Sequence, residues 1–499
     1  MIRTLKKEIS SHKIVYGLLV VLLALATFVR VYRTDIILQF FYDQGRDALS
    51  IWDLIHKGDV FLIGPTTGIA GIFRGPFYYY LIAPLYWLGG GNPVYPAIFL
   101  ALTTVVAIGI AFVLSKEFAN YKTAFFVTIF ASFSYYLVYA SRWLSNPTPM
   151  LLLSMLFLAS FVLIMKGYQW AWILLSTIAG LSLFHFGSSG EFFYFPATAV
   201  FTIWQFKHFP SLKVIVLSAV AFVLTASPLL LFDIRNDFLL SNNIKAFLFE
   251  KESFQTNFWE VLNARFGFYN GAFWGKIFPS VTATTKYLVL AFWLLFVYKL
   301  PLLTKNKYFI LVSIILLSPV IGLLFFQGNE GNIYGYYMTG YYFIWIIFLG
   351  LVLNSFWDNV IGKIFVLVFL VFFLQNNYPI VKSYITDKVD GETTIAFAPQ
   401  KEAIEWAYEN ADGEEFNTDV YVPPVIPYAY DYLFTWYESM PIYSGRVEDQ
   451  KELLYTLYEQ DPPHPERLDA WLERQAGIGE VIDEAKFAGI TIQRRRRIQ

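Results

Sequence analysis

Residues 14–31, IVYGLLVVLLALATFVRV, decide the fold, because this segment is apolar apart from Arg30. A helix needs about 20 mostly apolar residues to cross the hydrocarbon core of a bilayer. The segment does not read as a cleaved signal peptide, because no small-residue cleavage site follows it and Arg30 and Arg33 close it. It therefore predicts the first of a series of transmembrane helices.

The composition of the chain supports an integral membrane protein. Of its 499 residues, 57% are hydrophobic, 20% are aromatic and only 15% are charged, against roughly 25% charged in an average soluble domain. Too little charge remains to cover a water-soluble surface. We predict an all-α polytopic protein with about eleven spans, near residues 14–31, 93–114, 123–140, 148–165, 170–187, 192–206, 213–231, 285–303, 308–326, 335–353 and 362–375.

Charge fixes the predicted orientation and divides the chain in two. Lysines gather in alternate loops, which places these loops and the N-terminus in the cytoplasm. Residues 1–375 hold 25 Lys and Arg against 15 Asp and Glu, whereas residues 376–499 hold 12 against 23. We expect a membrane body over 1–375 and a soluble acidic domain over 376–499, which an odd number of spans places outside the cytoplasm. Its acidity argues against a nucleic-acid partner.

Three stretches outside the spans have recognisable patterns. Residues 34–92 and about 233–284 lie on the predicted outer face and are rich in aromatic residues, which favours amphipathic helices along the membrane surface. The C-terminal region combines a helical pattern, KEAIEWAYENA, with a short apolar strand, TDVYVPP. We expect a small α/β or α+β domain, which serves either in acceptor recognition or as a packing lid. The run Arg494–Arg497 reads most simply as a solvated terminus.

Several classes of chemistry are excluded by missing residues and motifs. The chain has no cysteine, so disulfides and thiolate sites are excluded. It lacks the GxxxxGK[ST] phosphate loop, the HExxH zinc motif and the Asp-x-Asp motif of metal-dependent nucleotide-sugar transferases. None of its five histidines has metal-ligand spacing. We predict no metal site, although a requirement for a divalent cation stays open, and any energy for catalysis must arrive in the substrate.

The densest polar cluster is FYDQGRDALSIWDLIHKGD, residues 41–59. Asp43 and Asp47 are four residues apart and share one helix face, with Arg46 beside them. One interpretation makes a carboxylate the general base, oriented by the neighbouring cation. The other is a solvated helix start with Asp43 as the N-cap. Spacing alone does not decide between them.

Further candidates are an arginine, a histidine and a glutamate near the outer face. Arg74 precedes Gly75, Pro76 and an aromatic run, a setting that suits either a lipid phosphate or a cation reaching the headgroups. His185 and Glu191 flank the outer end of the fifth span. Intramembrane ionisable groups suggest function, so these two are candidate substrate contacts, with hydrogen-bonded packing as the alternative.

The order of these features resembles a known family. A first span ends in Arg30, Tyr32 and Arg33, an outer-loop Asp follows ten residues on, and a basic, Pro-containing aromatic stretch enters the second span. Later segments, SPLLLFDIRNDF and GNIYGYYMTGYYF, agree. The pattern over about residues 10–355 is similar to the membrane glycosyltransferases of the C superfold (GT-C), namely the protein O-mannosyltransferases of glycosyltransferase family 39 and the lipid A aminoarabinose transferases.

The resemblance implies roles for particular residues. The family's catalytic Asp falls on Asp43, and its donor-phosphate contacts fall on Arg46 and Arg74. Gln44 replaces the family's second acid, so Asp47 is the candidate second carboxylate. The family's remaining phosphate-binding positions fall on Arg142, Tyr336 and Tyr337, the two tyrosines standing where the family has a late histidine.

The resemblance and the residues together predict an enzyme of the cell membrane. It would transfer a sugar from a polyprenyl-phosphate donor to a protein, lipid or glycan acceptor on the extracytoplasmic face. Asp43 would act as general base, although the sequence leaves Asp47 open for that role. The alternative class is a multi-span transporter or lipid flippase, which would place charges near the bilayer midplane on matching halves; here the charges gather at one face.

Overall fold

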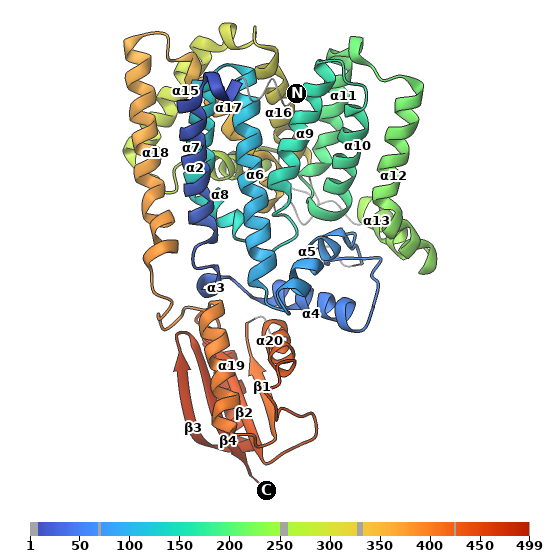
Figure 1. Ribbon diagram of the computed structural model, residues 1–499, viewed down its shortest axis with the longest axis vertical. Helices are drawn as coiled ribbons and strands as arrows, with labels where there is room; N and C mark the ends of the chain where they lie inside the picture. Colours follow the sequence, from blue (N-terminus) through green and yellow to red (C-terminus); the bar gives the residue numbers. More distant parts are fainter. Residues whose placement is uncertain (1–7, 68–70, 250–257, 327–332, 424–425, 499) are drawn as a thin grey trace.

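The protein consists of a helical bundle with a small mixed α and β region at one end (Figure 1). The computed structural model describes residues 8–67, 71–249, 258–326, 333–423 and 426–498. The N-terminal helix begins at the end of the bundle opposite the C-terminal region (Figure 1). The bundle helices are α2 (Lys13–Val31), α6 (Val94–Phe118), α7 (Tyr121–Phe133), α8 (Tyr135–Ser141), α9 (Met150–Met165), α10 (Ala171–Leu181), α11 (Tyr194–Trp204), α12 (Leu212–Arg235), α15 (Ala283–Leu303), α16 (Lys307–Gly322), α17 (Tyr342–Ser355) and α18 (Val360–Thr386).

Every predicted span falls on an apolar helix of this bundle, but not every helix is long enough to cross a bilayer alone. Seven helices in the described chain have the length and composition of a span, or eight if the bent pair α7 and α8 counts as one. Helices α9 and α10 are apolar but shorter. The chain is thus a multi-pass membrane protein, and the count of eleven stays a prediction. Helix α18 continues through residue 375 to Thr386, and the division into a body and a domain also stays a prediction.

A buried arginine stabilises the 60° break between α7 and α8. Ser134 begins α8 and accepts the backbone N–H of Leu137, so the last carbonyls of α7 lose their helical partners. The fully buried Arg30 of α2 donates to the carbonyls of Ala131 and Ser132 at 2.7 and 3.0 Å. Asn377 of α18 accepts the N–H of Tyr135 at 2.8 Å. The break is therefore fixed by specific polar contacts inside an apolar bundle.

The centre of the bundle is the segment formed by the 3₁₀-helix η7 (Gly335–Tyr341) and α17. Over a stretch of this segment long enough to cross a membrane, 94% is buried inside the protein, against 17% in α12 and 28% in α18. A helix that is apolar all round belongs inside a bundle, and the run YYFIWIIFLGLVL has that character. Because η7 opens this central helix, its tyrosines are held at the end of the bundle that faces the C-terminal region.

Two groups of short helices cover that end of the bundle. The first group lies within residues 34–92 and the second within 233–284, the two stretches expected to hold amphipathic helices. Their elements are α3 (Thr34–Ile37), α4 (Tyr42–His56) and α5 (Phe77–Leu88), then α13 (Leu239–Phe249), α14 (Phe258–Phe273) and the 3₁₀-turn η4 (Trp274–Lys276); the π-turn η1 (Ser182–Phe186) and the 3₁₀-turn η2 (Glu191–Phe193) connect α10 to α11.

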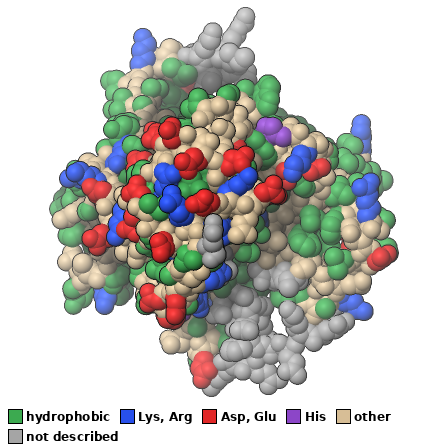
Figure 2. Space-filling model, turned by 90° about the horizontal axis from the view of Figure 1, so that it is seen from below, with side chains coloured by type: hydrophobic (Ala, Val, Ile, Leu, Met, Phe, Trp, Pro, Cys, Tyr) green, Lys and Arg blue, Asp and Glu red, His purple; other side chains and the backbone are tan. Residues whose placement is uncertain are grey.

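In its described residues the C-terminal region is a four-stranded sheet with three helices, which agrees with the α/β or α+β class predicted from the sequence. The strand order is β1-β2-β4-β3, with β1 and β2 parallel and the other pairs antiparallel. The elements are α19 (Phe397–Ala411), β1 (Phe416–Tyr421), α20 (Tyr428–Glu438), β2 (Leu453–Glu459), α21 (Pro465–Ile478), β3 (Gly479–Phe487) and β4 (Ile490–Arg497). Acidic and basic side chains are interspersed over this end of the molecule (Figure 2).

The expectation for the arginine run was wrong. Residues Arg494–Arg497 are not a solvated terminus but the end of β4, which lies between β2 and β3. Arg495 is 4% exposed and donates to Thr456 and to the carbonyl of Gly479. Arg494 pairs with Glu414 at 3.0 Å. A run of one charge looks solvated in sequence, but alternate side chains of a strand lie on opposite faces and find separate partners.

The two regions meet where α20 crosses α4. A side chain at Gly45 of α4 would collide with the backbone of Tyr428 and Ala429, so glycine permits the close approach of the two helices. The Tyr42 and Tyr428 rings meet edge to face at 4.9 Å. The first turn of α4, which carries the predicted catalytic acid, is therefore in contact with the C-terminal region.

Candidate functional site

The predicted acidic cluster begins α4. Phe41 is the N-cap, and its backbone N–H is bound by the side chain of Gln44 at 3.1 Å. Asp43 therefore lies in the first turn rather than at the cap, where a negative charge interacts favourably with the helix dipole. Its carboxylate pairs with Arg46 at 2.9 Å and remains 64% exposed. Asp43 is thus an accessible carboxylate with a cation held beside it.

Asp47 is the buried counterpart of Asp43. Its side chain is 8% exposed, and one oxygen accepts from Arg46 Nε and Nη2 at 3.0 and 2.8 Å and from the Tyr79 hydroxyl at 3.0 Å. Burial raises the pKa of Asp47 to about 6, although attraction to Arg46 opposes the change. Burial lowers the pKa of Arg46, but attraction to Asp47 and Asp43 outweighs it and raises the pKa. Arg46 thus joins one open and one enclosed carboxylate.

A short turn connects this cluster to Arg74. Arg46 also donates to the Thr66 hydroxyl at 3.1 Å, and Thr66 pairs with Phe73 in an antiparallel bridge. The backbone of Arg74 is held on both sides, since its N–H donates to Pro65 and its carbonyl accepts from Gly64. The predicted acid cluster and the predicted phosphate contact therefore belong to one hydrogen-bonded unit.

The Arg74 side chain lines a cavity of about 580 Å³ at the end of the bundle. Its other polar lining residues are Thr67, Ser188, Ser189, Asp233, Ser241, Tyr334, Tyr336 and Tyr337, and apolar side chains of η1, α12 and α13 form most of the rest. Arg74 forms no ion pair or side-chain hydrogen bond within the described ranges. Burial lowers the pKa of its guanidinium, which the charge of Glu191 and the two tyrosines partly offsets. A partly buried cation without an ion-pair partner in a mostly apolar cavity favours an anionic ligand with an apolar tail.

Glu191 fixes the wall of this cavity. It is 1% exposed and accepts the backbone N–H and hydroxyl of Ser188 at 2.5 and 2.8 Å with one oxygen, and the N–H of Gly340 at 3.0 Å with the other. The first contact orders the loop after η1, and the second ties that loop to η7. Glu191 therefore positions the serines and tyrosines of the wall instead of facing a ligand itself.

The contacts of His185 are those of a hydrogen-bonded packing residue, which was the alternative to a substrate contact. Its Nε2 lies 2.6 Å from the carbonyl of Thr225, and its ring stacks on Phe77 at 4.1 Å. A side chain at Gly75 would overlap the imidazole. The glycine next to Arg74 therefore allows the chain to pass over His185, which braces the start of α5.

Arg142 is not brought to this cavity. Its guanidinium donates to the carbonyls of Val29 and Tyr32 at 3.0 Å each, and it lies 5.2 Å from the ring centre of Tyr384. These contacts cap the end of α2 and join it to α18. The guanidinium N–H groups that would bind a phosphate are here bound to two backbone carbonyls.

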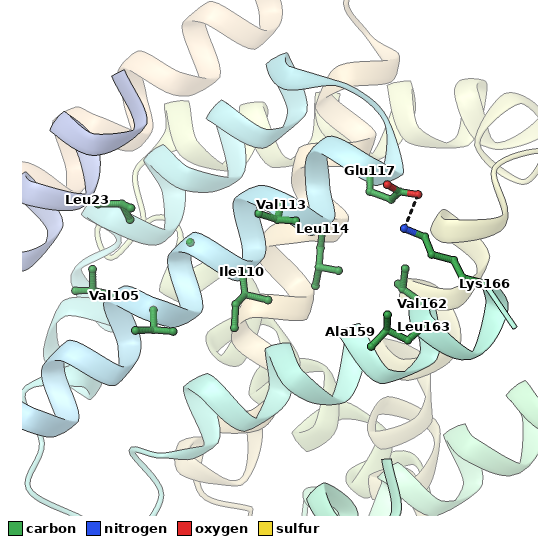
Figure 3. A pocket seen from close by; sticks show the side chains of 12 residues that line it. Leu23, Val105, Ile110, Val113, Leu114, Glu117, Ala159, Val162, Leu163 and Lys166 are labelled. Carbon is green, nitrogen blue, oxygen red and sulfur yellow. Dashed lines mark ion pairs between the residues drawn. The ribbon is translucent and has the colours of Figure 1, made fainter. Parts of the chain in front are cut away.

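The rest of the described bundle offers an apolar cavity and no metal cluster. No group of three or more acids and histidines with metal-binding geometry occurs among the residues the structure describes. A cavity of about 590 Å³ between α6 and α9 is lined by aliphatic side chains (Figure 3). Its polar pair, Glu117 and Lys166, is joined by an ion pair of 3.1 Å. That cavity offers packing for an apolar chain and no unpaired group for chemistry.

Four residues of the site were not singled out from the sequence. Tyr79 lies within a run of three tyrosines, and nothing in the run distinguishes the one that reaches Asp47. Thr66 and Ser188 lie in loops, where a hydroxyl carries no periodic signal. Asp233, which also lines the cavity, accepts the N–H of Ser241 at 3.0 Å and so ties α12 to α13.

Comparison with known proteins identifies the fold. No family model matches the sequence, and no curated protein matches it significantly. Among solved structures, ArnT from Cupriavidus metallidurans bound to undecaprenyl phosphate matches with a TM-score of 0.59 and 12% identity, over 96% of this chain and 98% of that one; its apo structure matches equally. The oligosaccharyltransferase AglB from Archaeoglobus fulgidus, with an inhibitory peptide and a dolichol-phosphate, matches with a TM-score of 0.49 and 12% identity, over 90% and 70%.

The match to ArnT extends over nearly the whole of both chains, the C-terminal region included. The fold is that of the GT-C membrane glycosyltransferases, and the family resemblance noted in the sequence is confirmed at the level of the fold.

Proposed function

We propose that the protein is a membrane glycosyltransferase that moves a sugar from a polyprenyl-phosphate carrier to an acceptor on the extracytoplasmic face. The observation that carries this proposal is the partly buried Arg74, which has no ion-pair partner among the described residues, in a largely apolar cavity, joined through Thr66 to the accessible Asp43 and Arg46 pair. A lipid phosphate has the matching chemistry, a charged head and an apolar tail. The fold shared with ArnT, whose structure holds undecaprenyl phosphate, supports the same donor class.

In the proposed reaction Asp43 is the general base. An acceptor oxygen attacks the anomeric carbon, the bond from that carbon to the phosphate oxygen breaks, and its electron pair leaves with the lipid phosphate. The acceptor's proton passes to Asp43. Asp47 is less suited to this step because its side chain is enclosed and its bonded oxygen is already shared by Arg46 and Tyr79. Asp47 would instead hold Arg46 in place.

The leaving phosphate would be stabilised by Arg74 with the hydroxyls of Tyr336 and Tyr337. Cations and hydroxyls fixed in an enclosed site lower the cost of developing charge without having to reorganise. The apolar wall from η1, α12 and α13 would take the first part of the prenyl chain. A single displacement of this kind inverts the anomeric centre.

The proposed face follows from two independent features. The lysine-rich loops and the start of α2 lie at one end of the bundle in the predicted topology, and the C-terminal region lies at the other (Figure 1). The candidate site lies at the end of the bundle that faces the C-terminal region, where α4 contacts α20. No observation favours the transporter or flippase alternative, because the candidate site lies at this end of the bundle and not at its middle, where transporters bind their substrates.

Retention of the lipid carrier tests the proposal. Purified protein in nanodiscs should bind radiolabelled undecaprenyl phosphate, and Arg74→Met should weaken binding about 10- to 100-fold, since a hydrogen bond to a charged group contributes about 1.5–3 kcal/mol. Arg235→Met, at an exposed arginine in the last turn of α12, controls for a general loss of charge near the headgroups. Equal binding by wild type and Arg74→Met would refute the phosphate assignment.

A further inference from the structure

A second polar cavity lies between the start of α4 and the C-terminal region. Its volume is about 500 Å³, and Phe41 and Tyr42 form one wall. The opposite wall carries Gln400 of α19, Tyr430 of α20 and Glu459 at the end of β2. Three elements far apart in sequence thus converge on one space, immediately beside the turn that holds Asp43.

The polar side chains of this cavity present hydrogen-bond acceptors. Gln400 is fully buried, and its Nε2 donates to the carbonyl of Phe40 at 2.9 Å, which orients the amide. Its Oε1 has no hydrogen-bond partner among the described residues. Glu459 is 7% exposed and accepts from the Tyr430 hydroxyl at 2.7 Å with one oxygen. Gln400 has no surface open to the cavity, whereas Glu459 keeps a small exposed part, so Glu459 is the acceptor within reach of a ligand that brings hydrogen-bond donors.

Burial also changes the charge of this cavity. It raises the pKa of Glu459 to about 7, although the hydrogen bonds from Tyr430 and Gln400 oppose the change. The carboxyl is therefore partly neutral near pH 7. This favours a neutral donor, such as a hydroxyl group, over a cationic ligand that would require a full counter-charge.

The rest of the wall suits the face of a sugar ring. The rings of Tyr42 and Tyr430 combine with Pro427 and aliphatic side chains, so flat apolar surface surrounds the buried acceptors. A pyranose has the complementary pattern, with C–H groups on its faces and hydroxyls at its edge. An enclosed space of this size, within the 300–1,000 Å³ typical of small-ligand sites, fits one or two sugar rings.

Tyr42 links the cavity to the proposed base. Its ring lines the cavity and lies 6.0 Å from the Arg46 guanidinium carbon, and Arg46 pairs with Asp43. The ring is held from the other side by Tyr428 of α20. The cavity is therefore lined by the residue that precedes Asp43 on α4.

We propose that this cavity binds the acceptor and that the acceptor is a carbohydrate unit, recognised through its hydroxyl groups by Glu459, with Gln400 holding the backbone of Phe40 behind it. The inference rests on the proposed function, because it assigns the second substrate of the same reaction. It gives the C-terminal region the role of completing the acceptor site.

Saturation-transfer NMR with the protein in nanodiscs tests binding without any chemical step. The probes are the methyl glycosides of glucose, galactose and mannose, with a serine- and threonine-containing hexapeptide as a separate probe. We expect at least one glycoside to bind wild type. Glu459→Gln and Ile426→Trp should each raise its apparent Kd about tenfold, the first by replacing a carboxyl oxygen with an amide NH₂ group that cannot accept a hydrogen bond and the second by filling the cavity from a side chain that is 41% exposed.

The matched control is Tyr437→Phe. Tyr437 lies on α20, as Tyr430 does. Its hydroxyl donates to a different glutamate, Glu405, at 2.6 Å, outside the cavity. Glycoside binding should be unchanged in this variant. Binding of the peptide in place of every glycoside, or glycoside binding that neither Glu459→Gln nor Ile426→Trp alters, would overturn the proposal.

Transfer assays on the same samples separate the two proposals. If sugar transfer proceeds and Ile426→Trp leaves both glycoside binding and the acceptor KM unchanged, the acceptor cavity is refuted while the proposed function stands. If no transfer from a lipid-linked sugar occurs although glycosides bind in a Glu459-dependent manner, the proposed function is refuted while the carbohydrate site stands.

Discussion

Replacing Asp43 with asparagine is expected to remove nearly all activity while leaving the fold intact. The Asp43 side chain is 64% exposed, and its ion pair with Arg46 is within one helix. An exposed ion pair contributes about 0–1 kcal/mol, and an acid in the first turn of a helix contributes roughly 0.3–1 kcal/mol. The expected loss of stability is therefore about 1 kcal/mol. Removal of a general base, by contrast, typically costs about 10²–10⁴-fold in rate.

Asp53→Asn is the matched control for this substitution. Asp53 also lies on α4 and also forms an ion pair within the helix, with Lys57 at 2.8 Å, but it is at the far end from the candidate site. Its loss should change the unfolding midpoint about as little as Asp43→Asn does, with a transfer rate close to wild type. The difference between the variants then isolates the proton acceptor from the general effect of a lost surface charge.

The assay combines initial rates of sugar transfer with thermal unfolding of the same purified samples. An inactive, stable Asp43→Asn beside an active Asp53→Asn supports the assignment. An active Asp43→Asn beside an inactive, folded Asp47→Asn would refute it. The base would then be the enclosed carboxylate one helical turn further along α4.

Three further predictions concern stability, topology and packing. Glu459→Gln should stabilise the protein by up to about 3 kcal/mol above pH 7 and have little effect below pH 4.5. The reason is that burial raises the pKa of Glu459 to about 7, so ionising this carboxyl destabilises the folded wild type as the pH rises. An equal difference in unfolding midpoint between variant and wild type at pH 5 and pH 8 would contradict this. Reporter fusions after residues 304 and 400 should read cytoplasmic and extracytoplasmic respectively, and a cytoplasmic signal at 400 would require an even number of spans. Gly45→Ala should separate α20 from α4, because the added methyl meets the backbone of Ala429, and hydrogen exchange in α20 should become faster.

The helices were predictable from sequence because membrane burial leaves a strong one-dimensional signal. Each predicted span falls on an apolar helix, and most of α19, residues 401–411, and strand β1 were both visible as patterns. What the sequence could not provide was the break at Ser134, since it depends on Arg30 and Asn377, which are distant in the chain. The burial of Arg495 was hidden for the same reason, because its partners come from other strands.

The candidate site was predictable only in part. Asp43, Arg46 and Arg74 could be selected by their residue types and order, and the structure joins them through Thr66. Local spacing placed Asp43 and Asp47 on one face but did not reveal that one is open and the other enclosed. That difference arises from Tyr79 and from α5, which a pattern within α4 does not contain.

The most direct test of the account is donor use by the purified protein. Supplied with a polyprenyl-phosphate-linked sugar and no nucleotide, wild type in nanodiscs should release polyprenyl phosphate in step with sugar transfer, and Asp43→Asn should slow that release about 10²–10⁴-fold. Transfer from a nucleotide sugar in a lipid-free assay, with no release from the lipid-linked form, would contradict the account.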